Sequence, residues 1–346
     1  MGLNDDKANK RLLALDTSTA ALTVAVTDEA GTRAFGEISS HSERNHSMHL
    51  VPTVKRLLAE LDMTPGDIGG IIVGRGPGSY TGVRIGITVA KTLAWTWSKP
   101  IVGVSSLEAL AIGGLRQGNA EQGHAEQGHA EQDDAEHADA DQSANEAAEG
   151  NMLRNVPMLA PEEPFSSWSG EGNGVDWVIP LMDARRGQVY TALFAGAGAG
   201  LHWQRCAPDG IRLMRDWADA VAARLEACIG TDRSLKLGGK SDSNGADGNN
   251  SRQDGAGFGL PPFSVPDVKP ARVWFAGDIE LHRTEAERLQ ERFGELIRIM
   301  PAHMQARWIG RIGAGPYAAG DFADVHRLEP NYTQLAEAEA KLLAKS

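Results

Sequence analysis

The feature that most constrains the fold is a pattern that occurs twice: a hydrophobic strand ending in aspartate, a small turn, and a second strand. Residues 12–26 read LLALDTSTAALTVAV, with Asp16 before the turn. Residues 177–195 read WVIPLMDARRGQVYTALFA, with Asp183 in the corresponding place. A chain of 346 residues is long for one small domain and fits two domains of roughly 100 to 150 residues. The pattern therefore predicts a duplicated α/β protein whose second copy begins near Asp176.

The first copy continues with alternating strand and helix signals. Strands are expected at 12–16, 22–26 and 33–39, because β-rich runs are separated there by turn residues. Apolar residues at helical spacing predict a helix within 42–61, which Pro52 should kink or delay. A strand at 71–73, a helix at 81–97 and a strand at 101–106 follow. The resulting order, βββαβαβ, is typical of α/β folds.

Two segments are expected to be disordered insertions in surface loops. Residues 116–174 contain the near repeat AEQGH, AEQGH, AEQDD, and residues 238–262 are rich in Gly, Asn, Asp and Ser. Neither has the apolar periodicity that would compensate for the entropy of ordering. We therefore divide the chain into an N-terminal subdomain at 11–115, an acidic insertion at 116–174 and a C-terminal subdomain at 175–335.

Composition excludes several classes of function. The formal net charge is -12, and the acidic insertion supplies most of it, so the rest of the chain lacks the basic surface of an autonomous nucleic-acid-binding protein. Two cysteines form no disulfide framework or metal motif. The N-terminal residues lack an apolar signal core, and no run approaches 18 apolar residues. We expect a cytoplasmic protein with no membrane segment.

A glycine-rich motif, GRGPGSYTGVRIG, occupies residues 74–86 between a strand and a helix. Backbone amides at such a turn can bind phosphate at the helix N-terminus. However, Gly74 and Gly76 are not followed by the third glycine of a dinucleotide fingerprint, and no Gly-Lys-Ser or Gly-Lys-Thr of a P-loop occurs. Phosphate binding and a structural turn formed by Gly74, Gly76 and Gly78 both remain open.

Small residues recur every four positions in the following helix and predict close packing against another helix. That helix could belong to the chain's own core or to another subunit. We expect a partner interface made by this ridge and by one side of the preceding helix. The expected interface residues are Leu50, Val54, Leu57, Gly82, Arg84, Gly86 and Ala90.

Other residues suggest weaker sites. Asp16, Thr17 and Ser18 resemble the phosphate-binding turn of actin-like ATPases, and Asp278 is a further candidate nucleotide contact; a plain turn and a helix cap are the alternatives. His41, His46 and His49 cluster before or on the first helix, and His46 and His49 lie one turn apart. Nothing nearby supplies the third ligand and fixed second shell that a metal site needs, so no metal site is expected. No nucleophile motif is present, and no catalytic residue is expected.

Several motifs occur along the chain: LLALDTST at 12–19, HSER at 41–44, GRGPGSYTGVRIG at 74–86, PIVGVSSLEALA at 100–111, MDARRGQVY at 182–190 and LEPNY at 328–332. Together they resemble the TsaB (YeaZ) family. Family members often read Tyr-Leu-Arg where this chain has Tyr332, Thr333 and Gln334.

The resemblance implies a duplicated actin-like ATPase (ribonuclease H-like) fold with two βββαβαβα-type subdomains. It also implies a non-catalytic dimerisation subunit that pairs with TsaD, acts with TsaE in tRNA threonylcarbamoyladenosine formation, and forms a homodimer when TsaD is absent. ATP and a metal ion would then be held by partner subunits, and tRNA would be contacted only through the complex. The alternative is an independent ATP-dependent phosphotransferase that uses Asp16 and Asp278.

Overall fold

The structure is a computed structural model, and it describes residues 10–41, 46–127, 174–197, 202–237 and 269–333. Residues 128–173 of the first expected insertion and all of the second, 238–262, lie outside these ranges. Within them, no helix is long and apolar enough to cross a membrane.

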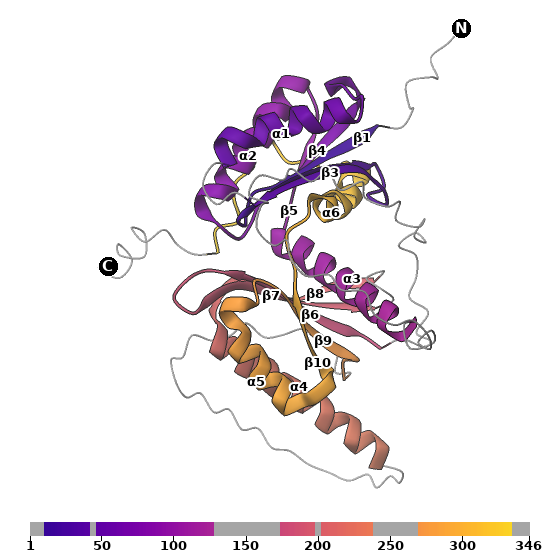
Figure 1. The fold of residues 1–346 in the computed structure, drawn as a ribbon, viewed down its shortest axis with the longest axis vertical. Helices are drawn as coiled ribbons and strands as arrows, with labels where there is room; N and C mark the ends of the chain where they lie inside the picture. Colours follow the sequence, from indigo (N-terminus) through magenta and orange to yellow (C-terminus); the bar gives the residue numbers. More distant parts are fainter. Residues whose placement is uncertain (1–9, 42–45, 128–173, 198–201, 238–268, 334–346) are drawn as a thin grey trace, which may run out of the picture.

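The chain has two halves with the same order of major elements (Figure 1). The first half contains β1 Arg11–Asp16, β2 Ala21–Asp28, β3 Ala34–His41, α1 His46–Glu60, β4 Ile68–Gly74, α2 Tyr80–Trp97, β5 Ile101–Val104 and α3 Ser106–Gln127. The second half contains β6 Asp176–Asp183, β7 Gln188–Ala197, β8 His202–Leu213, α4 Met214–Leu237, β9 Arg272–Gly277, α5 Arg283–Phe293, β10 Ile297–Pro301 and α6 Ala306–Ala319. Short 3-10 turns lie at η1 Pro65–Asp67, η2 Glu280–His282 and η3 Gly294–Leu296.

The two sheets have equivalent strand orders. The N-terminal order is β3-β2-β1-β4-β5, and the C-terminal order, read in the same sense, is β8-β7-β6-β9-β10. In each sheet the first three strands along the chain pair antiparallel, and the last two extend the sheet with parallel pairing. This correspondence confirms the duplicated α/β architecture predicted from the two strand-aspartate-turn patterns.

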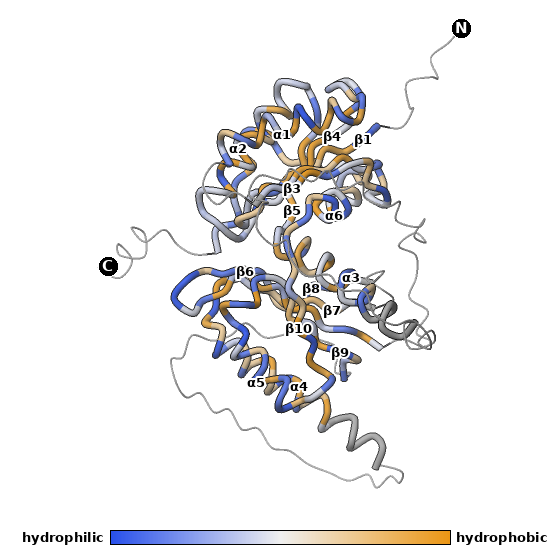
Figure 2. The backbone as a smooth tube through the Cα atoms, in the orientation of Figure 1, coloured by the Kyte–Doolittle hydropathy of each residue, from blue (hydrophilic) through white to orange (hydrophobic). Residues whose placement is uncertain are grey.

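Helices cover both faces of each sheet. Side chains of β1 alternate between the faces, so Leu13 and Leu15 pack in a core with α1 and α2. Leu12 and Ala14 pack in a different core, which includes residues of α3 and α6. Figure 2 shows hydrophobic residues concentrated in the strands that lie between these helices. Because both faces are covered, strands such as β4 are buried along their whole length.

The last helix of each half packs against the sheet of the other half. The central core combines residues of β1 and β4 with residues of α3, β6, β9 and α6. Gly118 of α3 lies against the ring of Trp274 in β9, where a Cβ would overlap the indole. Likewise, Gly313 of α6 lies against Ile72 of β4. The halves therefore share one continuous core and are not independent units.

The boundary predicted at residue 115 is wrong. Helix α3 continues to Gln127 and so includes the first AEQGH repeat. Gln117 donates to Glu121 at 3.1 Å one turn further along, and Leu115 and Gly118 pack against the C-terminal half. The low-complexity sequence did not indicate a helix here, because only a few positions on its inner face pack against the core and they form no clear apolar periodicity.

Candidate functional site

The β1–β2 turn closes around the Asp16 carboxylate. Asp16, Thr17 and Ser18 are buried. The Ser18 amide and hydroxyl donate to Asp16 Oδ1 at 2.7 and 2.6 Å. The hydroxyl of Ser106, at the start of α3, donates to Asp16 Oδ2 at 2.6 Å. Both carboxylate oxygens are thus used within the chain.

Burial dominates the electrostatics of this turn. It raises the pKa of Asp16 above its ordinary value, although the hydrogen bonds from Ser106 and Ser18 act in the opposite direction. Removing water from a carboxylate disfavours its charged form. Nucleotide binding by Asp16, Thr17 and Ser18 remains a prediction, and it would require this closed arrangement to open.

The glycine motif brings the backbone against the same turn. A Cβ at Gly74 would overlap Asp16 Oδ2, and Gly76 has a φ of +87°, which disfavours other residues. The Gly76 amide donates to Ser106 Oγ at 3.0 Å, and the Ser79 amide donates to Ser18 O at 2.7 Å. These two backbone amides therefore bind acceptors of the chain itself at the strand ends.

The small-residue ridge of α2 packs inside the chain. Gly82, Gly86 and Ala90 are buried, and a Cβ at Gly86 would overlap the hydroxyl of Thr17. The Thr17 hydroxyl donates to Gly82 O at 2.7 Å. The ridge thus lets α2 approach the β1–β2 turn.

The predicted interface residues of α1 are buried as well. Leu50, Val54 and Leu57 are at most 1% exposed and belong to the N-terminal core. Direct partner contact by these three residues and the three of the ridge is therefore a wrong prediction. Helical periodicity showed that these residues share one face of each helix, but it could not show that this face packs against the chain's own core. Arg84 is the one member of the predicted set that is exposed.

The outer surfaces of the same helices carry large hydrophobic side chains. Trp95 is 70% exposed, Met48 62% and Tyr80 54%. The Arg84 guanidinium lies 5.2 Å from the centroid of the Tyr80 ring and donates to its hydroxyl at 2.9 Å. Residues of these types are common at protein interfaces. Periodicity did not single them out, although Tyr80 lies within the glycine-rich motif.

The C-terminal segment, residues 320–333, follows α6 and runs along the N-terminal half. The Ala323 amide donates to Ile101 O at 2.9 Å, and the Asn331 amide donates to Arg75 O at 2.7 Å. The Tyr332 and Tyr80 rings lie 5.5 Å apart. An open cavity of about 490 Å³ lies beside this segment, lined by residues that include Arg75, Leu328 and Tyr332.

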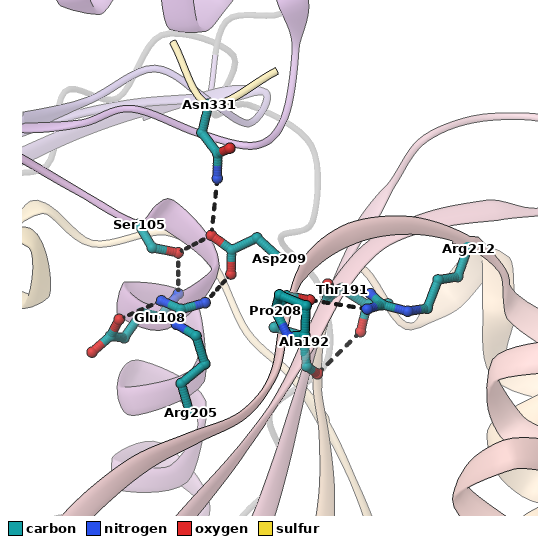
Figure 3. A network of polar contacts seen from close by, with 9 residues as sticks. All are labelled: Ser105, Glu108, Thr191, Ala192, Arg205, Pro208, Asp209, Arg212 and Asn331. Carbon is teal, nitrogen blue, oxygen red and sulfur yellow. Dashed lines mark hydrogen bonds and ion pairs between the residues drawn. The ribbon is translucent and has the colours of Figure 1, made fainter. Parts of the chain in front are cut away.

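A polar network joins the two halves next to this segment (Figure 3). Asp209 of β8 accepts from Ser105 Oγ at 2.7 Å and from Asn331 Nδ2 at 3.1 Å. Arg205 pairs with Asp209, and it also contacts Glu108 of α3 at 2.6 Å. Burial raises the pKa of Glu108 more than Arg205 lowers it. No spacing pattern in the sequence indicates this network, because its residues are far apart along the chain.

The Asp183 turn of the second half is more open. Asp183 Oδ1 accepts from the Arg185 amide at 3.1 Å and lies 3.2 Å from His282 Nε2. Asp278 Oδ2 accepts from the Asp183 amide at 3.0 Å. Loss of surrounding water raises the pKa of Asp278, although the residue is exposed. Its role in nucleotide binding remains a prediction.

Metal ligands do not cluster in the described ranges, where no group of three or more His, Cys, Asp and Glu residues could hold an ion. His46 Nε2 lies 3.3 Å from Thr19 O, and His49 is exposed. These two histidines have different surroundings although they lie one turn apart.

Comparison with known proteins shows which proteins this chain is similar to. A family model described as "TsaD: tRNA N6-adenosine threonylcarbamoyltransferase" matches residues 25–123. The chain is 29% identical over 330 residues to the tRNA threonylcarbamoyladenosine biosynthesis protein TsaB of Bacillus subtilis, covering 95% of this chain and 96% of that protein. It is 39% identical over 110 residues to TsaB of Escherichia coli, covering 31% of this chain and 45% of that protein.

Solved structures are similar over the whole fold. YeaZ from Pseudomonas aeruginosa has a TM-score of 0.51 at 19% identity, covering 93% of this chain and 99% of that one. The paired sheets define a protein of the duplicated actin-like ATPase (ribonuclease H-like) fold, as the sequence resemblance implied. Within that class, the chain is similar to proteins of the TsaB (YeaZ) family.

Proposed function

We propose that this chain is the non-catalytic dimerisation subunit of a tRNA threonylcarbamoyltransferase complex. It pairs with TsaD and acts with TsaE while threonylcarbamoyl is transferred to N6 of the adenosine 3′ to the anticodon in tRNAs that read ANN codons. The observation that carries this proposal is the likeness to B. subtilis TsaB along nearly the full length of both chains.

The geometry favours a non-catalytic subunit over an independent phosphotransferase. The Asp16 carboxylate, which the phosphotransferase alternative requires, has both oxygens occupied by this chain's own donors. ATP and the metal ion are assigned to partner subunits, and tRNA is contacted through the assembled complex. A cytoplasmic location follows from that proposed substrate.

The proposed contact surface consists of the exposed faces of α1 and α2. Trp95, Met48, Tyr80 and Arg84 lie on these faces with much of their side chains exposed. Tyr, Trp and Arg contribute disproportionately to binding energy in protein interfaces. A second copy of this chain occupies the surface when TsaD is absent, since a twofold pairing uses the same patch on both subunits.

Reconstitution tests the function directly. Purified TsaD, TsaE, tRNA, ATP and threonylcarbamoyl-adenylate are assayed for tRNA modification with and without this chain. We expect modification to require both TsaD and this chain, and the chain alone to give none. Modification by the chain alone would refute the non-catalytic role, and nucleotide hydrolysis by it alone would support the phosphotransferase alternative.

Paired variants test the surface. Trp95→Asp should weaken TsaD binding about tenfold or more, because a charge would be placed in an apolar contact. Leu281→Asp is the matched control, since Leu281 is 74% exposed on the C-terminal half. Equal effects of the two substitutions on TsaD affinity, at unchanged melting temperatures, would contradict the proposed surface.

A further inference from the structure

One carboxylate in the interdomain network receives donors from three separate parts of the chain. Asp209 has a side chain that is 8% exposed. It accepts from Ser105 just before α3, from Asn331 in the C-terminal segment, and from Arg205 on its own strand (Figure 3). The carboxylate therefore connects both halves and the C-terminal segment at a single point.

The network has one cationic donor for two carboxylates. Arg205 is shared between two carboxylates, those of Glu108 and Asp209. One guanidinium cannot neutralise two acids, so the neutral donors Ser105 and Asn331 carry part of the stabilisation of Asp209. Because these contacts are largely shielded from water, loss of one donor leaves a buried acceptor incompletely paired.

Asn331 transmits this constraint to the molecular surface. Its side chain contacts Asp209, while its backbone amide donates to Arg75 O at 2.7 Å. The next residue, Tyr332, is 51% exposed and lies against the Tyr80 ring. The Arg84 guanidinium lies over the Tyr80 ring. Asp209 is thus linked through Asn331 to a surface cluster formed by Tyr80, Arg84 and Tyr332.

We propose that Asp209 is a positioning residue for partner binding. It fixes Asn331, and through it holds Tyr332 beside Tyr80 and Arg84, so that the three side chains form one preorganised contact for the TsaD subunit. The inference rests on the proposed function, and it adds a contribution from the C-terminal half to a surface otherwise built by the N-terminal half.

The aromatic and cationic character of the cluster favours a protein partner. Acidic residues around the cavity, Asp324 and Glu329, accompany the basic residues Arg75 and Arg327, so the surface lacks the excess of positive charge that binds phosphate backbones. A rigid Tyr-Arg cluster is instead the composition of a binding hot spot, and fixing it beforehand reduces the entropy lost on association.

A double-mutant cycle in the full-length chain tests the proposal. TsaD affinity and melting temperature are measured for wild type, Asp209→Asn, Asn331→Ala, Tyr332→Ala and the double variant Asn331→Ala/Tyr332→Ala. Asp219→Asn is the matched control, because Asp219 of α4 is exposed and pairs with Arg288 of α5. We expect Asp209→Asn, Asn331→Ala and Tyr332→Ala each to weaken binding about tenfold, and the control to have no effect.

Non-additivity distinguishes positioning from a general structural role. Once Tyr332 is absent, Asn331→Ala should cause little further loss, because its effect acts through that ring. Fully additive losses, or unchanged affinity in Asn331→Ala, would overturn the inference. If Asp209→Asn lowers the melting temperature severely, the Asn331 and Tyr332 variants still decide the question. Failure of wild type to bind TsaD would instead refute the proposed function.

Discussion

The aspartate turns of the two halves occupy the same place in equivalent sheets but have opposite characters. Asp16 is completely enclosed, with donors from the turn and from α3 around it. The Asp183 turn lies open, and Arg185 and Arg186 adopt left-handed φ values of +66° and +54° beside it. The same topology has therefore been packed into a rigid junction in one half and left exposed in the other.

This difference separates fold from function. In the N-terminal half, the strand ends are filled by the glycine motif and α2, and the outer helix surfaces remain available. In the C-terminal half, the strand ends remain accessible while α4 and α5 are linked on the surface by ion pairs such as Arg288–Asp219. We conclude that the position of a residue in a duplicated fold does not by itself identify its role.

The largest expected effect comes from filling the N-terminal junction. Gly86→Leu should destabilise the monomer by about 3 kcal/mol or more, because the side chain would overlap Thr17 and disrupt the contact of α2 with the turn. Chemical denaturation measures the loss. Gly230→Ala in α4 is the control, since a Cβ added there would meet no heavy atom within 4 Å outside its chain neighbours and its own helix backbone, and it should stabilise by roughly 0.5 to 1 kcal/mol. A folded Gly86→Leu monomer of normal stability would contradict this packing.

Removal of the two aspartates should have unequal costs. Asp16→Ala leaves the buried hydroxyls of Ser18 and Ser106 without their acceptor and should cost about 2 to 3 kcal/mol. Asp183→Ala removes a carboxylate that is 27% exposed, and water can replace part of its contacts, so about 1 kcal/mol is expected. Urea unfolding at neutral pH compares the two. Equal losses would mean that the turns differ less than their burial indicates.

The pH dependence of the two sites should differ in size but share a sign. The folded-state pKa values of Asp16 and Asp278 are raised above the ordinary 3.8, so the folded chain holds these protons more tightly than the unfolded chain. The favourable contribution is present below the ordinary pKa and is lost as pH rises through the raised value. Relative to wild type, Asp16→Asn and Asp278→Asn should therefore gain stability with rising pH, more so at the enclosed Asp16. Parallel stability curves from pH 3 to 8 would contradict this expectation.

The smallest effect concerns strain in the open turn. Arg186→Gly should change stability by at most about 1 kcal/mol, and in the favourable direction, because glycine tolerates the positive φ that arginine adopts there. The same substitution at the helical residue Arg215 in α4 should be unfavourable. Thermal unfolding of the two variants compares these signs. Destabilisation by Arg186→Gly would indicate that the arginine side chain makes contacts that outweigh the strain.

Sequence patterns predicted the order of elements in the first half because each signal was local. The aspartate turns, the strand at 71–73 and the helix at 81–97 all carried their own periodicity or turn residues, and the structure confirms their positions. The same local signals could not say that Gly86 faces Thr17, because that contact spans separate elements. The ridge was therefore interpreted as an external surface when it is part of the core.

The interdomain network lay beyond sequence reasoning for the same reason. Ser105 and Asp209 are 104 positions apart, and Glu108 and Arg205 are 97 apart, so no spacing rule connects them. Tyr80 and Tyr332 did lie in recognised motifs, GRGPGSYTGVRIG and LEPNY. Their proximity became apparent only when the C-terminal segment was placed against the N-terminal half.

Hydrogen–deuterium exchange of the full chain, alone and with TsaD, tests the central claim most directly. The account predicts slower exchange in α2, Tyr80–Trp97, and in residues 328–333 when TsaD is bound, with no change in the Asp183 turn at residues 183–187. Slower exchange confined to residues 183–187 and 278–282, with α2 unaffected, would contradict it and assign partner binding to the open strand ends of the C-terminal half.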